Sequence, residues 1–395
     1  MMHPAGSSTP QERELRLWRQ YRYDVAPWLD MCDMTQTFGM AVPRVAATNE
    51  AYRAALLELP SAYLESEDTG VSGRDVGSRS ALSPALMAMG DEEGVLPDLQ
   101  GRALTTMSLL VCAFIRNMPL AWQQQPSEAV EHLVGYLEGH AADGGVMAAL
   151  YWLFVRLYLS TALAKATSLS IRLPSTDLFT SLEPAAGIAQ RTSSHAYRAL
   201  LLCARTLAFC FPHEGANSTA PDGTPSVPVV ETWRTLINEL DAWQTSRPGN
   251  FEPMVDMDAP AASASYPFPT IFFTTGAAVL ANQLYHTAML LLLSHKPRSW
   301  RMAYPLPTSM AAGSLTQSPL WHAQQVCGIA LNNDRKDCWD PCLVASLLVA
   351  ARGMTHEEQQ TAVMHGLSRI AEITRWKLDA VVAELKEEWD IAEAV

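Results

Sequence analysis

The stretch WHAQQVCGIALNNDRKDCWDPCLVASLLVAARGMTHEEQQTAVMHGLSRI, residues 321–370, says most about the fold of this chain. It predicts a helix, a polar turn, a second helix, a short connection and a third helix. The turn, residues 332–337 (NNDRKD), lies between strongly apolar segments. Thr355 and Glu358 match the capping-box pattern for the start of the third helix. The stretch carries no catalytic motif, so it indicates architecture rather than chemistry.

Helical periodicity continues over the rest of the chain. Trp18, Tyr21 and Val25 fall on one face of a first helix, which we expect to end at Pro27. No alternating apolar run is long enough to require a sheet. The sequence therefore predicts an all-α fold: a large, irregular multi-helical domain that resembles a solenoid. Further helices are predicted at residues 46–64, 102–118, 127–139, 146–173, 194–211, 231–243 and 271–295.

One domain is predicted over residues 15–395, after a flexible N-terminus at residues 1–14. Segments rich in Gly, Ser, Pro and acidic residues interrupt the helical pattern and predict irregular inserts. These inserts are expected near residues 65–98, 214–230, 247–269 and 297–319.

The composition limits the possible partners. The chain has 395 residues, of which 48% are hydrophobic and only 17% are charged, so it can bury a large core. Its net charge is −13, and an acidic chain is repelled by nucleic-acid phosphates. The Lys and Arg residues are scattered, and we see no basic run. Direct DNA or RNA binding would therefore need a local basic patch or a partner protein.

The cysteines do not form a recognisable framework. Seven occur, at wide spacings and without a Cys-x-x-Cys pair, which argues against disulfides and a structural zinc site. Buried thiols in a reducing compartment fit better. The N-terminal residues contain no apolar signal core, so secretion is not expected. The positions are Cys32, Cys112, Cys203, Cys210, Cys327, Cys338 and Cys342.

Residues 147–164 (MAALYWLFVRLYLSTALA) are almost long enough to span a membrane. Arg156 lies at the middle, however, and a central Arg costs about 2.5–3.5 kcal/mol on insertion scales. We therefore expect a buried core helix and no membrane association.

Three clusters resemble metal or catalytic sites, and none meets the requirements. His356 begins an HEEQQ run, but a zinc-protease helix needs a second His where this chain has Gln360. Cys338 and Cys342 supply only two of the four ligands that zinc needs. Asp334 and Asp337 enclose Arg335 and Lys336, which oppose magnesium binding. Solvated turns, helix ends and buried thiols explain these residues.

Histidines and tryptophans in the apolar helices could serve either core packing or ligand binding. His286 and His322 lie within apolar helices, where a hydrogen-bonded core histidine is the expected role. The tryptophans can either anchor helix packing or line a small-molecule pocket, and the sequence does not separate these uses. We assign no catalytic, cofactor-binding or metal-ligating residue, and no cofactor. The tryptophans concerned are Trp18, Trp28, Trp122, Trp152, Trp233 and Trp243.

Four groups of residues together resemble the fungal-specific transcription factor domain, the regulatory region of binuclear zinc-cluster regulators. They span residues 15–376, and their order makes the resemblance moderately specific. The first group is Ala26-Pro27-Trp28-Leu29-Asp30 with Phe38-Gly39 and Val42-Pro43, and the second is Trp233, Leu236, Leu240, Trp243 and Arg247-Pro248. The third is residues 267–273 (PFPTIFF) with Asn282-Gln283-Leu284-Tyr285-His286, and the fourth is Cys327-Gly328-Ile329-Ala330 with Asp337-Cys338-Trp339-Asp340-Pro341.

The resemblance implies an all-α domain that regulates transcription in a fungal nucleus, sometimes in response to an effector or partner. In that family a separate N-terminal module with six cysteines binds DNA. This sequence contains no such module and begins about where the regulatory domain begins. We therefore expect DNA contact through a DNA-binding partner, or a missing N-terminal module.

Three hypotheses follow. The first is a transcription regulator that is not an enzyme and controls a metabolic gene set, such as one for secondary metabolism. The second is an all-α enzyme or small-molecule-binding protein of a metabolic gene cluster. The third is a scaffold that only forms a homodimer. Leu378, Val381, Leu385 and Trp389 form a stripe on the last helix, which is too short for a sustained coiled coil.

Overall fold

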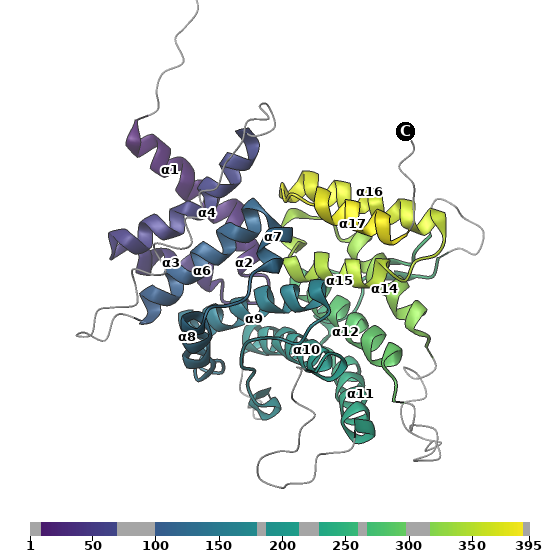
Figure 1. Cartoon of the computed structure of the whole chain (residues 1–395). Coiled ribbons are helices and arrows are strands. Elements are labelled where there is room, and N and C mark those ends of the chain that lie inside the picture. Colours follow the sequence, from purple (N-terminus) through teal and green to yellow (C-terminus); the bar gives the residue numbers. More distant parts are fainter. Residues whose placement is uncertain are drawn as a thin grey trace, which may run out of the picture.

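The computed structural model describes residues 9–68, 99–179, 187–212, 229–259, 267–297 and 317–389. Helices dominate these residues, and two strands of three residues each are the exception (Figure 1). The prediction of an all-α, multi-helical fold is confirmed. Most of the predicted inserts at 65–98, 214–230 and 297–319, and residues 1–8 of the predicted flexible N-terminus, lie outside the described residues.

Along the chain the described elements fall into N-terminal, middle and C-terminal groups. The N-terminal elements are α1 (Pro10–Gln20), the π-helical η1 (Tyr21–Val25), α2 (Ala26–Leu29), α3 (Thr37–Ala47), α4 (Glu50–Asp68), α6 (Leu99–Arg116), α7 (Met118–Gln123), α8 (Glu128–Glu138) and α9 (Gly145–Lys165). The middle elements are η3 (Thr176–Phe179), α10 (Ile188–Cys210), α11 (Val229–Thr245), η4 (Gly249–Phe251), β1 (Val255–Met257), β2 (Thr270–Phe272) and α12 (Gly276–Ser294). The C-terminal elements are α14 (Pro319–Asn332), η6 (Lys336–Cys338), α15 (Pro341–Ala351), α16 (Glu357–Thr374) and α17 (Asp379–Glu388).

Two long apolar helices form the centre of the protein. In α9 every residue from 148 to 163 is buried, which confirms the core helix predicted at 147–164. The second is α12, also buried over most of its length. By length and composition both helices could cross a bilayer, but 89% and 83% of their apolar windows are buried inside the protein. Such burial is typical of core helices.

Helices from distant parts of the sequence pack around this centre. α9 contacts α3, α8 and α10, and α12 contacts α10 and α14. α15 packs against both α9 and α12 and so connects the two halves of the core. The N-terminal helices lie at one end of the molecule in Figure 1, and α16 and α17 cover α15 at the other. In a regular solenoid each helix packs only against its neighbours in the sequence. Here α9 also packs against α15, so the arrangement is not a regular solenoid.

The start of the chain differs from the prediction in two ways. Residues 10–14, expected to be flexible, begin α1, because Thr9 and Glu12 form a capping box: Glu12 Oε2 accepts from Thr9 N (2.8 Å) and Thr9 Oγ1 from Glu12 N (3.3 Å). Pro27 does not end the helix. A π-helical turn precedes it, and Pro27 then occupies the first turn of α2, where a missing N–H is tolerated.

Later boundaries also shift. The helix expected at 271–295 starts at Gly276, because Ile271 lies in β2 instead. Of the insert expected at 247–269, the described residues are irregular apart from η4 and β1, and residues 260–266 lie outside the described residues. The capping box expected from Thr355 and Glu358 does not form. His356 is the N-cap residue of α16, so Glu358 is one position too early to complete that box.

Candidate functional site

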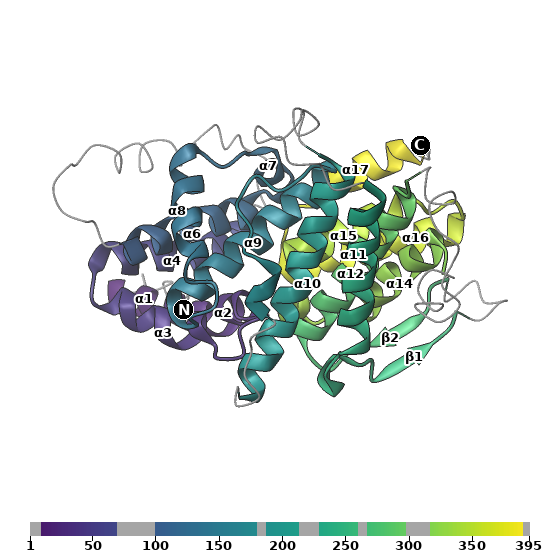
Figure 2. The ribbon, with the colours of Figure 1, turned by 90° about the horizontal axis from the view of Figure 1, so that it is seen from below.

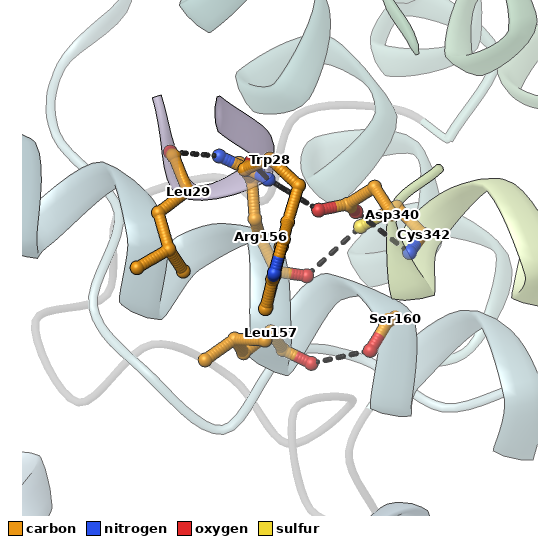
Figure 3. A network of polar contacts seen from close by, with 7 residues as sticks. All are labelled: Trp28, Leu29, Arg156, Leu157, Ser160, Asp340 and Cys342. Carbon is orange, nitrogen blue, oxygen red and sulfur yellow. Dashed lines mark hydrogen bonds and ion pairs between the residues drawn. The ribbon is translucent and has the colours of Figure 1, made fainter. Parts of the chain in front are cut away.

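Arg156 lies at the middle of α9 and forms a buried polar junction with two distant segments (Figure 3). Its side chain is only 2% exposed. Nη1 donates to Leu29 O (2.8 Å) and Nη2 donates to Trp28 O (2.8 Å), both in α2. Nε donates to Asp340 Oδ2 at 3.1 Å, and Nη2 also contacts this oxygen. We call Arg156, Asp340, Trp28 and Leu29 the arginine junction.

Asp340 connects the junction to α15. It is the N-cap residue of this helix, and its Oδ1 accepts from Cys342 N at 2.8 Å. Cys342 Sγ in turn donates to Arg156 O at 2.8 Å. Burial alone would lower the pKa of Arg156, but the adjacent Asp340 charge raises it above its usual value. The guanidinium is therefore charged and paired at every physiological pH, as in a structural ion pair.

Asp30 follows directly on α2 and closes the turn into α3. Its two carboxylate oxygens accept from Phe38 N and Gly39 N, each at 2.8 Å. Burial nevertheless raises the pKa of Asp30 to about 7, against the two backbone donors, with the charge of Asp33 adding to the increase. A carboxyl group that titrates near neutrality therefore lies beside the arginine junction.

A second buried polar centre joins α12 and α14. His286 Nδ1 and His322 Nδ1 are 3.0 Å apart and share one hydrogen bond. Both rings are buried in the core. Burial lowers the pKa of His322 to about 4, and burial and the neighbouring His322 lower that of His286 well below its ordinary value. At neutral pH both rings are therefore uncharged, and one Nδ1 donates while the other accepts.

Aromatic rings extend this centre toward α10 and α11. Trp243 stacks on His195 (4.7 Å between centroids) and on Tyr285 (5.6 Å). Tyr285 meets His286 edge to face at 4.9 Å. Trp321 contacts both His286 and His322. The histidine–aromatic cluster consists of His195, Trp243, Tyr285, His286, Trp321 and His322.

Two nitrogen atoms of this cluster are buried without a partner. Nε2 of His195 and Nε2 of His322 make no hydrogen bond to any residue that the structure describes. Burial, with Arg198 and Arg247 nearby, lowers the pKa of His195 to about 4, so this ring is also neutral. Buried polar atoms almost always have a protein, water or ligand partner. The cluster therefore offers two hydrogen-bonding positions to a molecule other than the protein.

The residue clusters that the sequence excluded as metal or catalytic sites have other roles in the structure. Asp334 pairs with Arg369 (2.9 Å) and Asp337 with Arg335 (2.9 Å), so the two carboxylates serve different ion pairs. Cys338 and Cys342 are both buried, as expected for structural thiols. Within the described ranges no group of three or more His, Cys, Asp or Glu side chains could hold a metal ion. His356 is exposed at the start of α16.

The structure shows which tryptophans belong to the two polar centres and which pack elsewhere in the core. Trp243 belongs to the histidine–aromatic cluster, and Trp28 contributes its carbonyl to the arginine junction. Trp152 instead stacks on Tyr197 at 4.5 Å. Trp122 and Trp233 are buried packing residues, whose indole N–H groups donate to Ser160 Oγ (3.1 Å) and Leu292 O (2.9 Å).

Sequence reasoning missed the arginine junction as a unit. From the sequence, Arg156 was considered only as evidence against a membrane helix, and Asp340 only as one residue of a segment that resembles the fungal domain. Two local signals were available: a charge at the middle of an apolar helix needs a buried partner, and Asp340-Pro341 is a helix start. No family model matches the chain, and neither a curated protein nor a solved structure is similar to it.

Proposed function

We propose that this chain is a transcription regulator of the fungal zinc-cluster type, which controls a metabolic gene set in the nucleus and has no catalytic role. The all-α fold agrees with the resemblance in its sequence. The net charge of −13 suits a protein that works through partner proteins rather than through its own contacts with phosphate.

One observation carries this proposal: the four segments that resemble the fungal regulatory domain contact one another. Arg156 joins Trp28 in the first segment to Asp340 in the fourth. Arg247 Nη1 in the second donates to Asn282 Oδ1 in the third at 2.7 Å. Segments that lie far apart in the sequence thus come together in one core. Their convergence supports a shared architecture.

Gln283 makes the remaining link, between the third segment and the start of α15. Its Nε2 donates to Leu343 O at 2.8 Å, three residues beyond Asp340. The contact is buried, and the same nitrogen also reaches Ser346 Oγ at 2.5 Å. All four segments therefore belong to one hydrogen-bonded core, which is the arrangement that a single regulatory domain requires.

DNA contact would come from a partner protein or from a zinc-cluster module that this sequence does not contain. In the described part of the chain the cysteines do not gather with other His, Cys, Asp or Glu side chains into a group that could hold a metal ion. Burial raises the pKa of the Cys32 and Cys210 thiols to about 12. These groups are therefore protonated at cellular pH and serve as small core residues.

Chromatin immunoprecipitation tests the proposal. A copy with a C-terminal tag is expressed from its own locus, and its nuclear localisation is checked by microscopy. We expect enrichment at discrete promoters, with the partner or module identified from the same complexes. A well-expressed protein without promoter enrichment would refute the transcriptional role.

A second candidate function, small-molecule binding, is favoured by the unpartnered nitrogens of the histidine–aromatic cluster. Three neutral imidazoles and three larger aromatic rings suit a planar, largely apolar molecule that hydrogen-bonds to Nε2 of His195 or His322. The two functions are compatible, because such a molecule could be the effector of a regulator. It could also be the substrate of an all-α enzyme.

Thermal unfolding with a metabolite library tests the second candidate. A ligand that binds only the folded state raises the free energy of unfolding by about 2.7 kcal/mol at a hundredfold excess over Kd. We expect this increase to disappear in His322→Phe, which removes the Nε2 acceptor or donor. It should persist in Trp152→Phe, which alters an aromatic stack outside the cluster. Equal stabilisation of both variants would place the ligand elsewhere.

A further inference from the structure

The two short strands form a ribbon with one protected edge. β1 and β2 are antiparallel, with Val255 opposite Phe272 and Met257 opposite Thr270. The far side of β2 is closed by one amide side chain: Asn333 Nδ2 donates to Ile271 O (2.8 Å), and Phe273 N donates to Asn333 Oδ1 (2.9 Å). Figure 2 shows β2 between α14 and β1, with β1 outermost.

The other edge of the ribbon is open. Because Ile271 O and Phe273 N point toward Asn333, the intervening Phe272 must point toward β1, and its carbonyl accepts from Met254 N at 2.7 Å. Within β1, Asp256 lies opposite Ile271, and because Ile271 O points away from β1 the two form a non-hydrogen-bonded pair, which turns the N–H and C=O of Asp256 away from β2. No residue that the structure describes makes a hydrogen bond to these two groups. An unpaired strand edge is a template for another strand.

The side chains around this edge are apolar and acidic. Met254 is 66% exposed and Met257 is 56% exposed, and Phe272 is also exposed on the same ribbon. Three acids of the same segment are also exposed: Asp256 lies within β1, and Glu252 and Asp258 flank it in the sequence.

We propose that β1 is a docking edge for an extended segment of a partner protein, in which Lys or Arg residues alternate with apolar residues. The exposed backbone groups accept only an extended chain. The methionines would contact its apolar side chains, and the acids would pair with its basic ones across the strands. A second copy of this chain is a poor occupant, because antiparallel pairing about Asp256 would bring like charges together.

This surface is independent of the transcriptional proposal, since it is argued from the ribbon alone. Its test is fluorescence anisotropy with the whole chain and a labelled eight-residue peptide of alternating Lys and Val. We expect saturable binding that weakens as salt is raised from 0.05 to 0.5 M, roughly a threefold decrease in the Debye length. A Glu–Val peptide, and a Lys–Val peptide with alternate N-methylated backbone nitrogens, should not bind.

Two substitutions test the backbone and the charge, and Asp256→Asn, which removes only the charge, is the reference for Asp256→Pro, which removes the charge and the N–H. Asp256→Pro removes the outward N–H, and an edge strand tolerates Pro where that N–H faces solvent. Asp256→Lys keeps the N–H and reverses the charge. We expect each to weaken peptide binding about tenfold, with unfolding midpoints near that of the parent chain. If Asp256→Pro fails to fold, Asp256→Lys still decides the charge contribution.

Three results would overturn the proposal. The first is equal binding of the Lys–Val and Glu–Val peptides. The second is parent-like affinity of Asp256→Lys. The third is self-association of the chain in sedimentation that Asp256→Pro abolishes, because that result would assign the edge to a second copy.

Discussion

The arginine junction and the histidine–aromatic cluster are both buried polar centres, but they differ in how fully their titratable side chains are hydrogen-bonded; in the junction it is the Trp28 indole Nε1 that is buried without a partner among the described residues. In the junction, Arg156 donates to two carbonyls and a carboxylate, and Asp340 also caps a helix. In the cluster, His195 and His322 each keep a buried nitrogen without a partner. A satisfied network holds elements together, whereas an unsatisfied one has capacity for a further molecule. The difference indicates an architectural role for the junction and supports the proposal that the cluster binds a further molecule.

The largest predicted effect is at the junction. Asp340→Ala leaves the buried Arg156 charge without its partner and removes the N-cap of α15. We expect a loss of about 3–5 kcal/mol in the free energy of unfolding, measured by urea denaturation. Asp337→Ala is the matched control, because it removes an exposed ion pair with Arg335 worth at most about 1 kcal/mol.

Removing both charges sharpens this test. The double variant Arg156→Met with Asp340→Leu has no stranded charge, so it should be more stable than Asp340→Ala alone. If Asp340→Ala costs no more than its control, the junction does not hold the core together and the assignment of an architectural role is wrong.

The second prediction concerns acid sensitivity of the cluster. The folded state lowers the pKa of His322 from 6.5 to about 4, so the unfolded chain binds a proton at this ring more readily than the folded protein does. The free energy of unfolding therefore has its full value, for this group, above pH 6.5 and decreases as the pH falls toward 4. Between pH 7 and pH 5 this group should reduce the free energy of unfolding by about 2 kcal/mol. His322→Phe should lose this dependence in urea denaturation at the two pH values.

His356→Gln, a change at an exposed histidine, is the control and should keep the pH dependence of the parent chain. A parent-like acid dependence in His322→Phe would mean that His322 is already protonated, or exposed, in the folded protein. The description of the cluster as a neutral, buried site would then fail.

The third prediction has the opposite sign and lies beside the junction. The folded state raises the pKa of Asp30 from 3.8 to about 7, so this group favours folding below pH 3.8 and its contribution is lost as pH rises toward 7. Between pH 5 and pH 7 it should reduce stability by about 2 kcal/mol. Asp30→Asn removes this decrease, and the measurement is the slope of unfolding free energy against pH.

Asp258→Asn, at an exposed position, provides the comparison for that slope. Because His195, His286 and His322 all have lowered pKa values and oppose Asp30, the parent chain should lose stability on acidification from pH 7 to pH 5, less steeply in His322→Phe and more steeply in Asp30→Asn. A single slope shared by the parent and Asp30→Asn would show that the carboxylate is ionised well below neutrality.

The parts of the fold that could be predicted are those that local patterns determine. The buried helix at 147–164 follows from its apolar composition and one central charge, and the all-α class follows from the periodicity. The partner of Arg156 could not be predicted, because Asp340 is distant in sequence and only the packing of α9 on α15 brings them together. The same holds for His286 and His322, which lie on different helices.

Boundaries were missed where tertiary contacts override local preference. Ile271 belongs to an apolar run that predicts a helix, yet the Asn333 side chain holds it in a strand. Pro27 should stop a helix, yet a π-helical turn before it leaves Pro27 in a tolerant position. In both cases tertiary packing in the core, rather than local helix propensity, determines the secondary structure of a segment that resembles the fungal domain.

Transcript profiling is the most direct test of the proposed role in transcription. RNA from a strain lacking the gene is compared with RNA from its parent, under conditions in which the protein is made. We expect altered expression of a discrete metabolic gene set, restored by the parent gene. An unchanged transcriptome, in cells shown to contain the folded protein before deletion, would contradict it.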